Sequence, residues 1–300
     1  MPEQFCNVGR GIELCWDGFG DPDRPTLLLI MGLATQMIAW QEDFCERLAE
    51  RGFYVMRFDN RDIGRSTHID GPVPSIPQLA LRPRAAASYT LATMAGDTAA
   101  LLRKLDRAPA HVVGASMGGM IAQTLAALHP EYVTSLVSIM SNTGSRWSGR
   151  PTPTLLPMFL QRPSGGRDAY IDRIETLFGT IGSSGLPRDP EDIRRLAAAS
   201  YDRDHDPAGP QRQLAAILAS GDRTAELKTI DVPTLVIHGD ADPLVALSGG
   251  RATARAIPGA RLMIVPRMGH DLPRVIWPQV IDAIVDNARL AEQRQPVSAA

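Results

Sequence analysis

The sequence predicts an α/β protein whose central sheet is mostly parallel. Apolar blocks without polar alternation, at residues 26–31, 53–58, 132–140 and 233–238, are typical of strands buried on both faces of a parallel sheet. Helical patterns lie between these blocks, and Ser116 stands among glycines between an apolar run and an alanine-rich helical pattern. The order of strand, helix and strand therefore predicts a parallel sheet with flanking helices.

The composition fits a globular protein of this class. The chain has 300 residues, of which 44% are hydrophobic and 21% charged, and its formal net charge is −2. This weak net charge gives no electrostatic signature of binding to nucleic acid or to an anionic membrane. Residues 1–11 show no secretory signal pattern, and the longest apolar run, around 27–34, is shorter than the roughly 20 residues of a membrane helix. We therefore expect a soluble cytoplasmic protein without nucleic-acid or membrane partners.

The three cysteines, Cys6, Cys15 and Cys45, point to neither disulfides nor a metal site. They are odd in number, lie near the start of the chain and lack the C-x-x-C spacing. We expect buried free thiols.

The first third of the chain supplies three strands and a helix. Alternating apolar residues predict an antiparallel edge strand over residues 11–16, followed by the buried block at 26–31. A helical pattern runs from Trp40 to Ala49 and ends at Gly52, before the next buried block.

Two segments after this strand lack a periodic pattern. Residues 59–66 are rich in charge, and we expect a structural turn network rather than a metal or catalytic cluster, because no histidine or cysteine at ligand spacing accompanies them. Residues 72–83 are rich in proline and predict a connection. A helix with one apolar face then runs from about Thr90 to Leu105.

The second half of the chain interrupts the sheet pattern and then resumes it. The helix after Ser116 ends before Pro130, and the next strand block is followed by short helical patterns separated by prolines, one of them capped by Asp189. Strand blocks return at 233–238 and 261–265, and an amphipathic helix follows through residues 280–288. We expect the tail at residues 293–300 to fray.

Ser116 is the candidate nucleophile. In Gly114-Ala115-Ser116-Met117-Gly118 the serine lies at a sharp turn between a strand and a helix, where only absent or very small side chains allow close backbone packing. A serine hydroxyl is a weak nucleophile near neutral pH and needs a base that an acid orients.

His270 and Asp242 are the candidate base and acid. His270 follows the last predicted strand, and Asp242 follows the strand before it, at the sheet edge where α/β proteins place their sites. His238 also ends a strand, and Asp240 lies in the same turn as Asp242, so these two are the rivals. We expect His238 to be a packed strand residue and Asp240 a solvated turn residue.

These motifs together resemble the α/β-hydrolase fold, and within it the aclacinomycin methylesterase type of carboxylesterase. The order serine, acid, histidine is that of α/β-hydrolases. The resemblance covers nearly the whole chain and rests on the segments at 28–32, 59–66, 114–119, 239–245 and 268–270.

The resemblance implies a fold, a domain division and further site residues. Residues 1–144 and 224–300 correspond to the core, and residues 145–223 to a helical cap inserted before the last two strands. The backbone N–H groups of Leu33 and Met117 correspond to the oxyanion hole. Many relatives carry a histidine two residues before the first of these donors, whereas this chain has Met31 there, which leaves open how the loop is supported.

The function implied is a serine hydrolase that cleaves a carboxylic ester of a small molecule, with methylesterase activity as the narrower hypothesis and with no metal or organic cofactor needed. A cofactor-free perhydrolase, a carbon–carbon bond hydrolase and an acyltransferase use the same triad and stay open. A non-catalytic ligand receptor is disfavoured because all three triad residues are present. Four apolar residues of the cap suggest an apolar substrate group, although core packing explains them as well: Met158, Phe159, Leu177 and Phe178.

Overall fold

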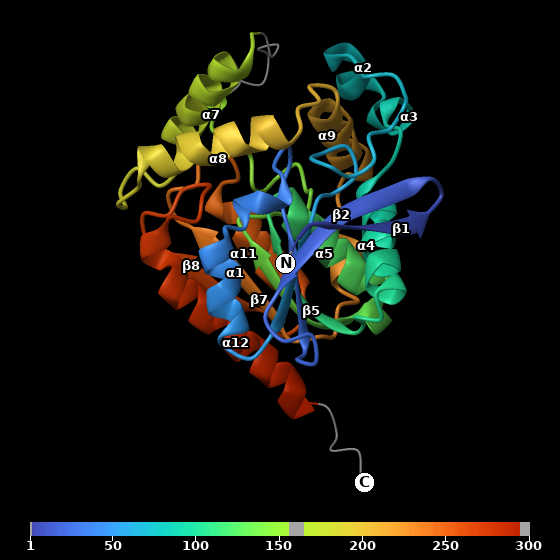
Figure 1. The fold of residues 1–300 in the computed structure, drawn as a ribbon, viewed down its shortest axis with the longest axis vertical. Coiled ribbons are helices and arrows are strands. Elements are labelled where there is room, and N and C mark those ends of the chain that lie inside the picture. The colour runs from blue at the N-terminus through green and yellow to red at the C-terminus, as the bar shows by residue number, and fades with distance from the viewer. Residues whose placement is uncertain (1, 156–164, 295–300) are drawn as a thin grey trace.

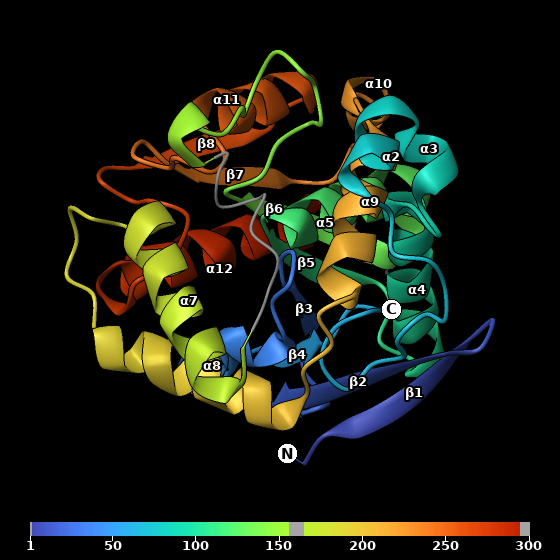
Figure 2. The ribbon, with the colours of Figure 1, turned by 90° about the horizontal axis from the view of Figure 1, so that it is seen from above.

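The computed structural model describes residues 2–155 and 165–294, which build one eight-stranded sheet with helices on both faces (Figures 1 and 2). The strand order is β1-β2-β4-β3-β5-β6-β7-β8. The strands are β1 (Gln4–Gly9), β2 (Ile12–Phe19), β3 (Thr26–Ile30), β4 (Tyr54–Phe58), β5 (Ala110–Ala115), β6 (Val133–Ile139), β7 (Thr234–Gly239) and β8 (Arg261–Val265).

The parallel part of the sheet runs from β4 to β8, as the apolar blocks predict. Every residue of β3, β4, β5 and β7 is buried, because helices cover both faces of these strands. Parallel strands have their carboxyl ends at one edge of the sheet, so the loops that follow β3, β5, β7 and β8 meet there.

Helices cover the sheet in two layers. On one face, α4 (Leu91–Lys104), α5 (Met117–Leu128) and α11 (Leu247–Ala256) contribute to one buried apolar cluster. On the other face, α1 (Glu42–Ala49) and α12 (Trp277–Arg294) pack together and against the sheet in a second cluster. The helix expected through residues 280–288 is therefore confirmed as part of α12.

The N-terminal edge of the sheet differs from the expectation. The strand predicted over residues 11–16 is β2, which extends to Phe19 and pairs antiparallel with both β1 and β4, so it is not the edge strand. The edge strand here is β1, for which no strand is predicted from the sequence. Beyond the predicted strand end, Asp17 also lies in β2 and pairs with the buried Arg57 of β4 at 2.8 Å. This ion pair explains how charged side chains stand inside an apolar strand block.

Two further boundaries differ. The proline-rich connection contains two short helices, α2 (Ile76–Leu81) and α3 (Pro83–Ala86), whose prolines lie in the first turn, where a missing N–H costs nothing. The helix expected from Trp40 begins at Glu42, and Trp40 itself follows the 3-10 turn η1 (Met37–Ala39). Proline positions therefore mark helix starts here rather than a loop.

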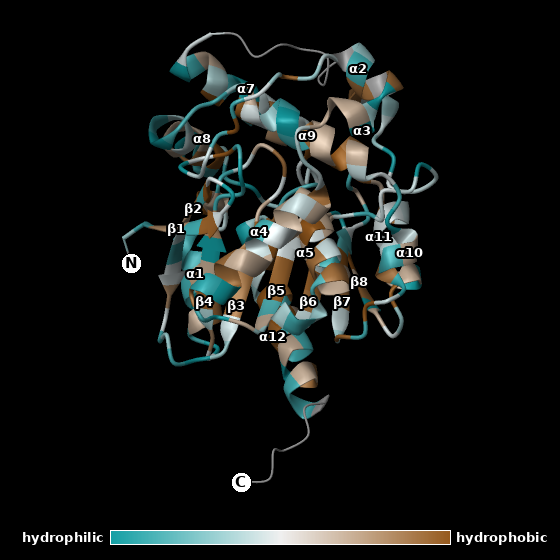
Figure 3. Ribbon diagram, turned by 90° about the vertical axis from the view of Figure 1, so that its right-hand side faces the viewer, coloured by the Kyte–Doolittle hydropathy of each residue, from teal (hydrophilic) through white to brown (hydrophobic). Residues whose placement is uncertain are grey.

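The segment between β6 and β7 is helical, as the proline-separated patterns predict. It holds η3 (Pro153–Leu155), α7 (Arg167–Ile181), α8 (Pro190–Arg203), α9 (Gly209–Ser220) and the short α10 (Thr224–Leu227). Asp189 caps α8 by accepting a hydrogen bond from the N–H of Glu191, as expected. In Figure 3, α7, α8 and α9 lie at the end of the sheet opposite the protruding C-terminus of α12. We call α7, α8 and α9 the inserted helices.

Some expectations fall outside the described residues or are settled by burial. Met158 and Phe159 lie outside the described residues, as does most of the tail expected to fray. Within the described part, all three cysteines are buried and free, as expected. No helix among the described residues combines the length and apolar character that crossing a membrane requires.

Candidate active site

Ser116 lies at a sharp turn between β5 and α5. Its backbone has φ 55° and ψ −119°, a conformation that is strained for a residue with a side chain. A Cβ atom at Gly114 would lie 2.1 Å from the carbonyl oxygen of Gly118, and one at Gly118 would lie 2.1 Å from that of Ile30. Glycine is therefore required on both sides of the serine, since the turn packs backbone directly against backbone.

His270 links Ser116 to Asp242 in one chain of contacts. Its Nε2 atom lies 3.0 Å from Ser116 Oγ, and its Nδ1 atom lies 2.7 Å from Asp242 Oδ2. The side chain of Asp242 is fully buried and that of His270 is 8% exposed. The three predicted triad residues, which come from the loops after β5, β7 and β8, are thus brought together in hydrogen-bond geometry.

Asp242 is held independently of the histidine. Its Oδ1 atom accepts the backbone N–H groups of Leu244 at 2.9 Å and Val245 at 2.8 Å, so Oδ2 is left to face His270. The rival acid, Asp240, accepts the N–H of Arg267 at 2.6 Å in an exposed turn, in agreement with the expected turn role.

His238 is packed beside the triad acid. Its Nε2 donates to the carbonyl of Val245 at 2.7 Å and lies 3.7 Å from Asp242 Oδ2. Burial lowers the pKa of His238, which favours a neutral ring near pH 7. These contacts are those of the packed strand residue that we expected. Elsewhere in the core, His111 contacts Ser135 at 2.9 Å, and burial lowers the pKa of His111 to about 4.

The loop after β3 approaches Ser116 closely. A Cβ atom at Gly32 would lie 3.1 Å from Ser116 Cβ and 3.7 Å from its Oγ. Leu33 follows Gly32, and Met117 is the first residue of α5, so both backbones lie next to the serine. That their N–H groups form an oxyanion hole stays a prediction.

Two amide side chains support this loop. They hold it in a chain that has Met31 where many relatives have a histidine. Asn60 Nδ2 donates to the carbonyl of Met31 at 3.0 Å. The N–H of Ala34, whose φ is 59°, donates to Gln213 Oε1 at 3.0 Å, and Gln213 Nε2 donates to the carbonyl of Arg61 at 2.9 Å. Asn60 lies in the charged segment that is predicted to be structural. No sequence pattern predicts a role for Gln213 of α9.

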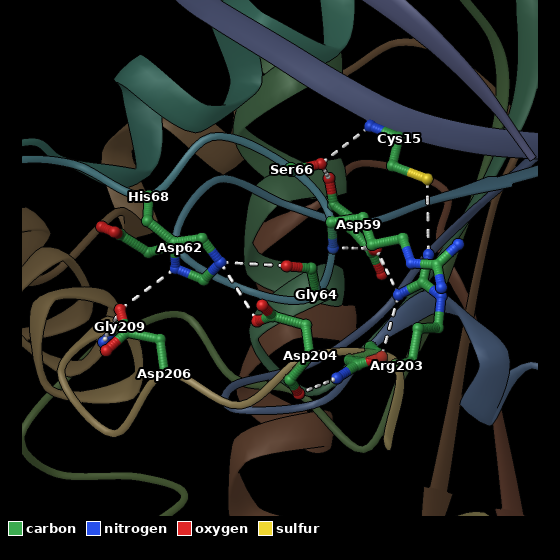
Figure 4. A network of polar contacts seen from close by, with 12 residues as sticks. Cys15, Asp59, Asp62, Gly64, Ser66, His68, Arg203, Asp204, Asp206 and Gly209 are labelled. Carbon is green, nitrogen blue, oxygen red and sulfur yellow. Dashed lines mark hydrogen bonds and ion pairs between the residues drawn. The ribbon is translucent and has the colours of Figure 1, made fainter. Parts of the chain in front are cut away.

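Asp59 is the centre of the predicted turn network. Its buried carboxylate accepts the N–H groups of Met37 at 2.7 Å and Arg65 at 3.0 Å. Arg203 Nη1 lies 2.6 Å from its Oδ2 (Figure 4). Arg203 is the last residue of α8, so this ion pair ties an inserted helix to the core. All these partners are structural, which agrees with the expectation for residues 59–66.

His68 joins the same network, which the sequence did not indicate. Its Nδ1 lies 3.0 Å from Asp206 Oδ2, and its Nε2 lies 2.9 Å from the carbonyl oxygen of Gly64 and 3.1 Å from Asp204 Oδ2 (Figure 4). Burial lowers the pKa of His68, but the Gly64 carbonyl and the two carboxylates outweigh it, so the net pKa is raised. The ring therefore bridges the 59–68 segment and the turn between α8 and α9.

Asp62, His68 and Asp206 resemble a metal site only in spacing. Their ligand atoms lie within 4.8 Å of one another. The guanidinium of Arg212 already lies 2.8 Å from Asp62 Oδ1 and 3.1 Å from Asp206 Oδ2. Since this buried cation balances both carboxylates, the cluster is better explained as a salt-bridge network than as a metal site.

A large cavity opens onto Ser116 and His270. Its volume is about 1600 Å³, and its described walls come mainly from the loops of the sheet edge and from the inserted helices. Leu177 and Phe178, two of the apolar residues marked from the sequence, line it. Their neighbours in the apolar lining include Ile174, Ile181, Leu214 and Ile217.

Comparison with known proteins places this arrangement among hydrolases. The chain matches the model of the alpha/beta hydrolase fold family over residues 25–273. Two rhodomycin D methylesterases, from Streptomyces sp. (strain C5) and Streptomyces peucetius, are 31% and 30% identical to it over 301 residues, which cover 93% of this chain and 96% of each relative. The crystal structure of a hydrolase from Pseudomonas aeruginosa superposes with a TM-score of 0.71 at 26% identity, covering 96% of this chain and 98% of that one.

Proposed function

The chain belongs to the α/β-hydrolase fold family, and from this premise we propose that it is a serine carboxylesterase that uses Ser116, His270 and Asp242 as its catalytic triad. The observation that carries the proposal is the unbroken chain of contacts from Ser116 Oγ through both ring nitrogens of His270 to Asp242. A serine, a base within hydrogen-bond reach and a buried acid that orients the base are what acyl transfer through a serine requires.

The first half of the reaction forms an acyl-enzyme. His270 Nε2 removes the proton of Ser116 as the hydroxyl oxygen attacks the ester carbonyl, and Asp242 holds the Nδ1–H and stabilises the imidazolium. The N–H groups of Leu33 and Met117 receive the developing oxyanion, where each donor contributes roughly 3 kcal/mol. The positive end of α5 adds to the same stabilisation. His270 then protonates the leaving alcohol.

The second half returns the enzyme to its starting state. His270 removes a proton from water, which attacks the acyl-enzyme through a second oxyanion, and the acid leaves as Ser116 recovers its proton. Every proton moves between Ser116, His270 and the reactants, so these steps need no metal or organic cofactor.

We further propose that the substrate is the methyl ester of a bulky, largely apolar acid. The cavity, at about 1600 Å³, exceeds the roughly 300–1,000 Å³ of common ligand sites, which favours a large acyl group. The apolar side chains of α7 and α9 favour an apolar face on that group. The relatives named as methylesterases favour a small leaving alcohol. A cytoplasmic location, without nucleic-acid or membrane partners, stays our prediction.

The proposal is tested with nitrophenyl esters of graded acyl length and with methyl esters of bulky aromatic acids, measured as nitrophenol and methanol release. We expect turnover by the native protein and a loss of at least about 10⁴-fold in kcat for Ser116→Ala, as for other triad serines. A fluorophosphonate labels one serine per chain in the native protein and none in the variant. Full turnover by a folded Ser116→Ala protein contradicts the triad assignment.

The same assays separate the alternatives. A perhydrolase forms peracid when hydrogen peroxide is added, and an acyltransferase transfers the acyl group to an added alcohol in preference to water. A carbon–carbon bond hydrolase leaves the esters intact and cleaves diketones instead. A non-catalytic receptor stays unlabelled, because its serine is not activated.

A further inference from the structure

The loop that carries His270 is bonded to the end of α7. The N–H of His270 donates to the carbonyl of Ile181 at 2.8 Å, and the N–H of Gly269 donates to Ser183 Oγ at 2.8 Å. Both bonds join residues more than eighty positions apart, one on an inserted segment and one after β8. The proposed catalytic base is therefore anchored on the insertion as well as on the sheet.

Asp271 completes a ring of hydrogen bonds with Ser183 and the backbone of residues 269–271, which we call the ring below. Its Oδ1 atom accepts the N–H of Ser183 at 2.8 Å and also the hydroxyl of Ser183. The serine hydroxyl thus donates to Asp271 and accepts from Gly269. Ser183 is fully buried, and the side chain of Asp271 is 13% exposed. Because the hydroxyl has one proton, its donation to Asp271 fixes the lone pair that faces Gly269.

Close packing leaves this ring little room to shift. A Cβ atom at Gly269 would lie 2.4 Å from the carbonyl carbon of Gly182, and one at Gly182 would lie 2.7 Å from Asp271 Oδ2. The two backbones therefore touch without side chains between them. Burial raises the pKa of Asp271, while the two bonds from Ser183 oppose that rise. Arg188 lies 4.0 Å from the other carboxylate oxygen.

We propose that Asp271 is a positioning residue for the reaction: through Ser183 it fixes the backbone of Gly269 and His270, so that the imidazole stays in reach of both Ser116 and Asp242. This inference rests on the proposed function, because it assigns the role by way of His270. Among the described residues, Asp271 itself forms no hydrogen bond with Ser116 or Asp242. A displacement of about 1 Å in a reacting group costs on the order of 10²-fold in rate, so a contact that holds this backbone affects kcat directly.

The ring also joins the triad to the substrate cavity. Ile181 and Asp271 both line the cavity, and Ile181 supplies the carbonyl that binds the N–H of His270. The end of α7 and the loop of His270 are therefore bonded to each other at the wall of the cavity. A change in the ring is expected to alter turnover more than substrate affinity.

The test compares Asp271→Ala, Asp271→Asn, Ser183→Ala and the double alanine variant, with kcat expressed per serine titrated by fluorophosphonate. We expect Asp271→Ala and Ser183→Ala each to lower kcat by about 10- to 100-fold with KM changed less than about twofold. Asp271→Asn keeps an oxygen that accepts both bonds from Ser183, so its kcat stays within about threefold of the native value. The double variant falls no further than the lower single variant, because both changes break one ring.

A control variant, Asp202→Ala, breaks the exposed ion pair between Arg167 and Asp202 of the inserted helices, and its kcat stays within about twofold of the native value. The proposal is overturned if Asp271→Ala and Ser183→Ala keep native kcat, if their losses lie in KM or in the titrated fraction alone, or if Asp271→Asn loses as much as Asp271→Ala. Ser116→Ala is measured in parallel. If Ser116→Ala is inactive while Asp271→Ala and Ser183→Ala keep native kcat, only the positioning role is overturned. If Ser116→Ala is fully active, the proposed function is overturned.

Discussion

The sharp turn at residues 114–118, which we call the elbow, and the inserted helices both contribute to the site. They differ in how they are held in place. Of the twelve residues of α5, which begins at the elbow, ten are buried, and the turn before it packs backbone against backbone. Two of the inserted helices bury far less of themselves: α7 buries two of its fifteen residues and α8 only Ala197 among its fourteen, whereas α9 buries six of twelve. The elbow is therefore held by direct backbone contact, and α8 is held mainly by long polar side chains that reach the core.

Those polar contacts end at the loops that carry the proposed chemistry. Gln213 of α9 holds the loop of Leu33, and Ser183, just after α7, holds the loop of His270. Arg203 of α8 pairs with Asp59, which also accepts the N–H of Met37, four residues after Leu33. The inserted segment therefore supports the site as well as enclosing it.

The largest expected effect comes from replacing one glycine by alanine in each of the two regions. In Gly118→Ala the new Cβ meets the carbonyl oxygen of Ile30 at 2.1 Å, so the elbow must shift, and we expect a loss of about 3 kcal/mol in stability together with loss of fluorophosphonate labelling. Gly179 lies in exposed α7 with nothing within 4 Å of an added Cβ, and Gly179→Ala is expected to stabilise by about 0.5–1 kcal/mol.

Thermal unfolding followed by circular dichroism measures both changes. Opposite shifts of the midpoint support the contrast. Equal midpoints for the two variants contradict it, because they mean that the elbow tolerates a side chain.

A smaller effect is expected where the insertion reaches the proposed oxyanion loop. Gln213→Leu removes the acceptor of the Ala34 N–H and the donor to the Arg61 carbonyl, so both backbone groups lose their partner. The loop of Leu33 then relaxes, and kcat is expected to fall about tenfold, less than the loss of a whole oxyanion donor. Steady-state kinetics on a nitrophenyl ester measure it.

The matched control is Gln279→Leu on α12. Gln279 is exposed and is not among the described residues that line the cavity. Its kcat is expected to stay within about twofold of the native value. A native kcat for Gln213→Leu rules out support of the site through α9.

The smallest expected effect is on the pH dependence of stability, through the contacts of His68 with the turn between α8 and α9. The pKa of His68 is raised in the folded protein, so its stabilising contribution is complete below the unfolded pKa of about 6.5 and is lost as the pH rises through the folded value. Asp204 and Asp206 remain partly exposed and are screened by water, so the contribution stays below about 1 kcal/mol.

His68→Gln removes the charge, and we expect its urea midpoint to vary less than that of the native protein between about pH 6 and pH 9. His129→Gln is measured beside it as a control for the loss of an imidazole, since His129 contacts the ring of Tyr132 and lies outside the His68 network. Identical profiles for the native protein and His68→Gln argue against a charged His68 in the folded state.

Much of the fold could be predicted because its signals are local. The fully buried parallel strands appear as unbroken apolar blocks, and Pro130, Asp189 and Pro190 mark helix ends by their own chemistry. The edge strand β1 could not be placed, since half of its residues are exposed and its role depends on pairing with β2. The helices α2 and α3 could not be predicted from their prolines, because proline is found both after the end of a helix and in its first turn.

The elbow and the candidates for the triad could be predicted from the sequence, because each of these residues lies in the loop after a predicted strand and the carboxyl ends of parallel strands converge. Which polar side chains hold these loops in place depends on tertiary contacts. Gln213 meets the N–H of Ala34 across 179 positions, and Ser183 meets Asp271 across 88. Such pairs produce no periodic pattern in the sequence, since a buried backbone group can form its hydrogen bond with any suitable side chain that tertiary packing places beside it.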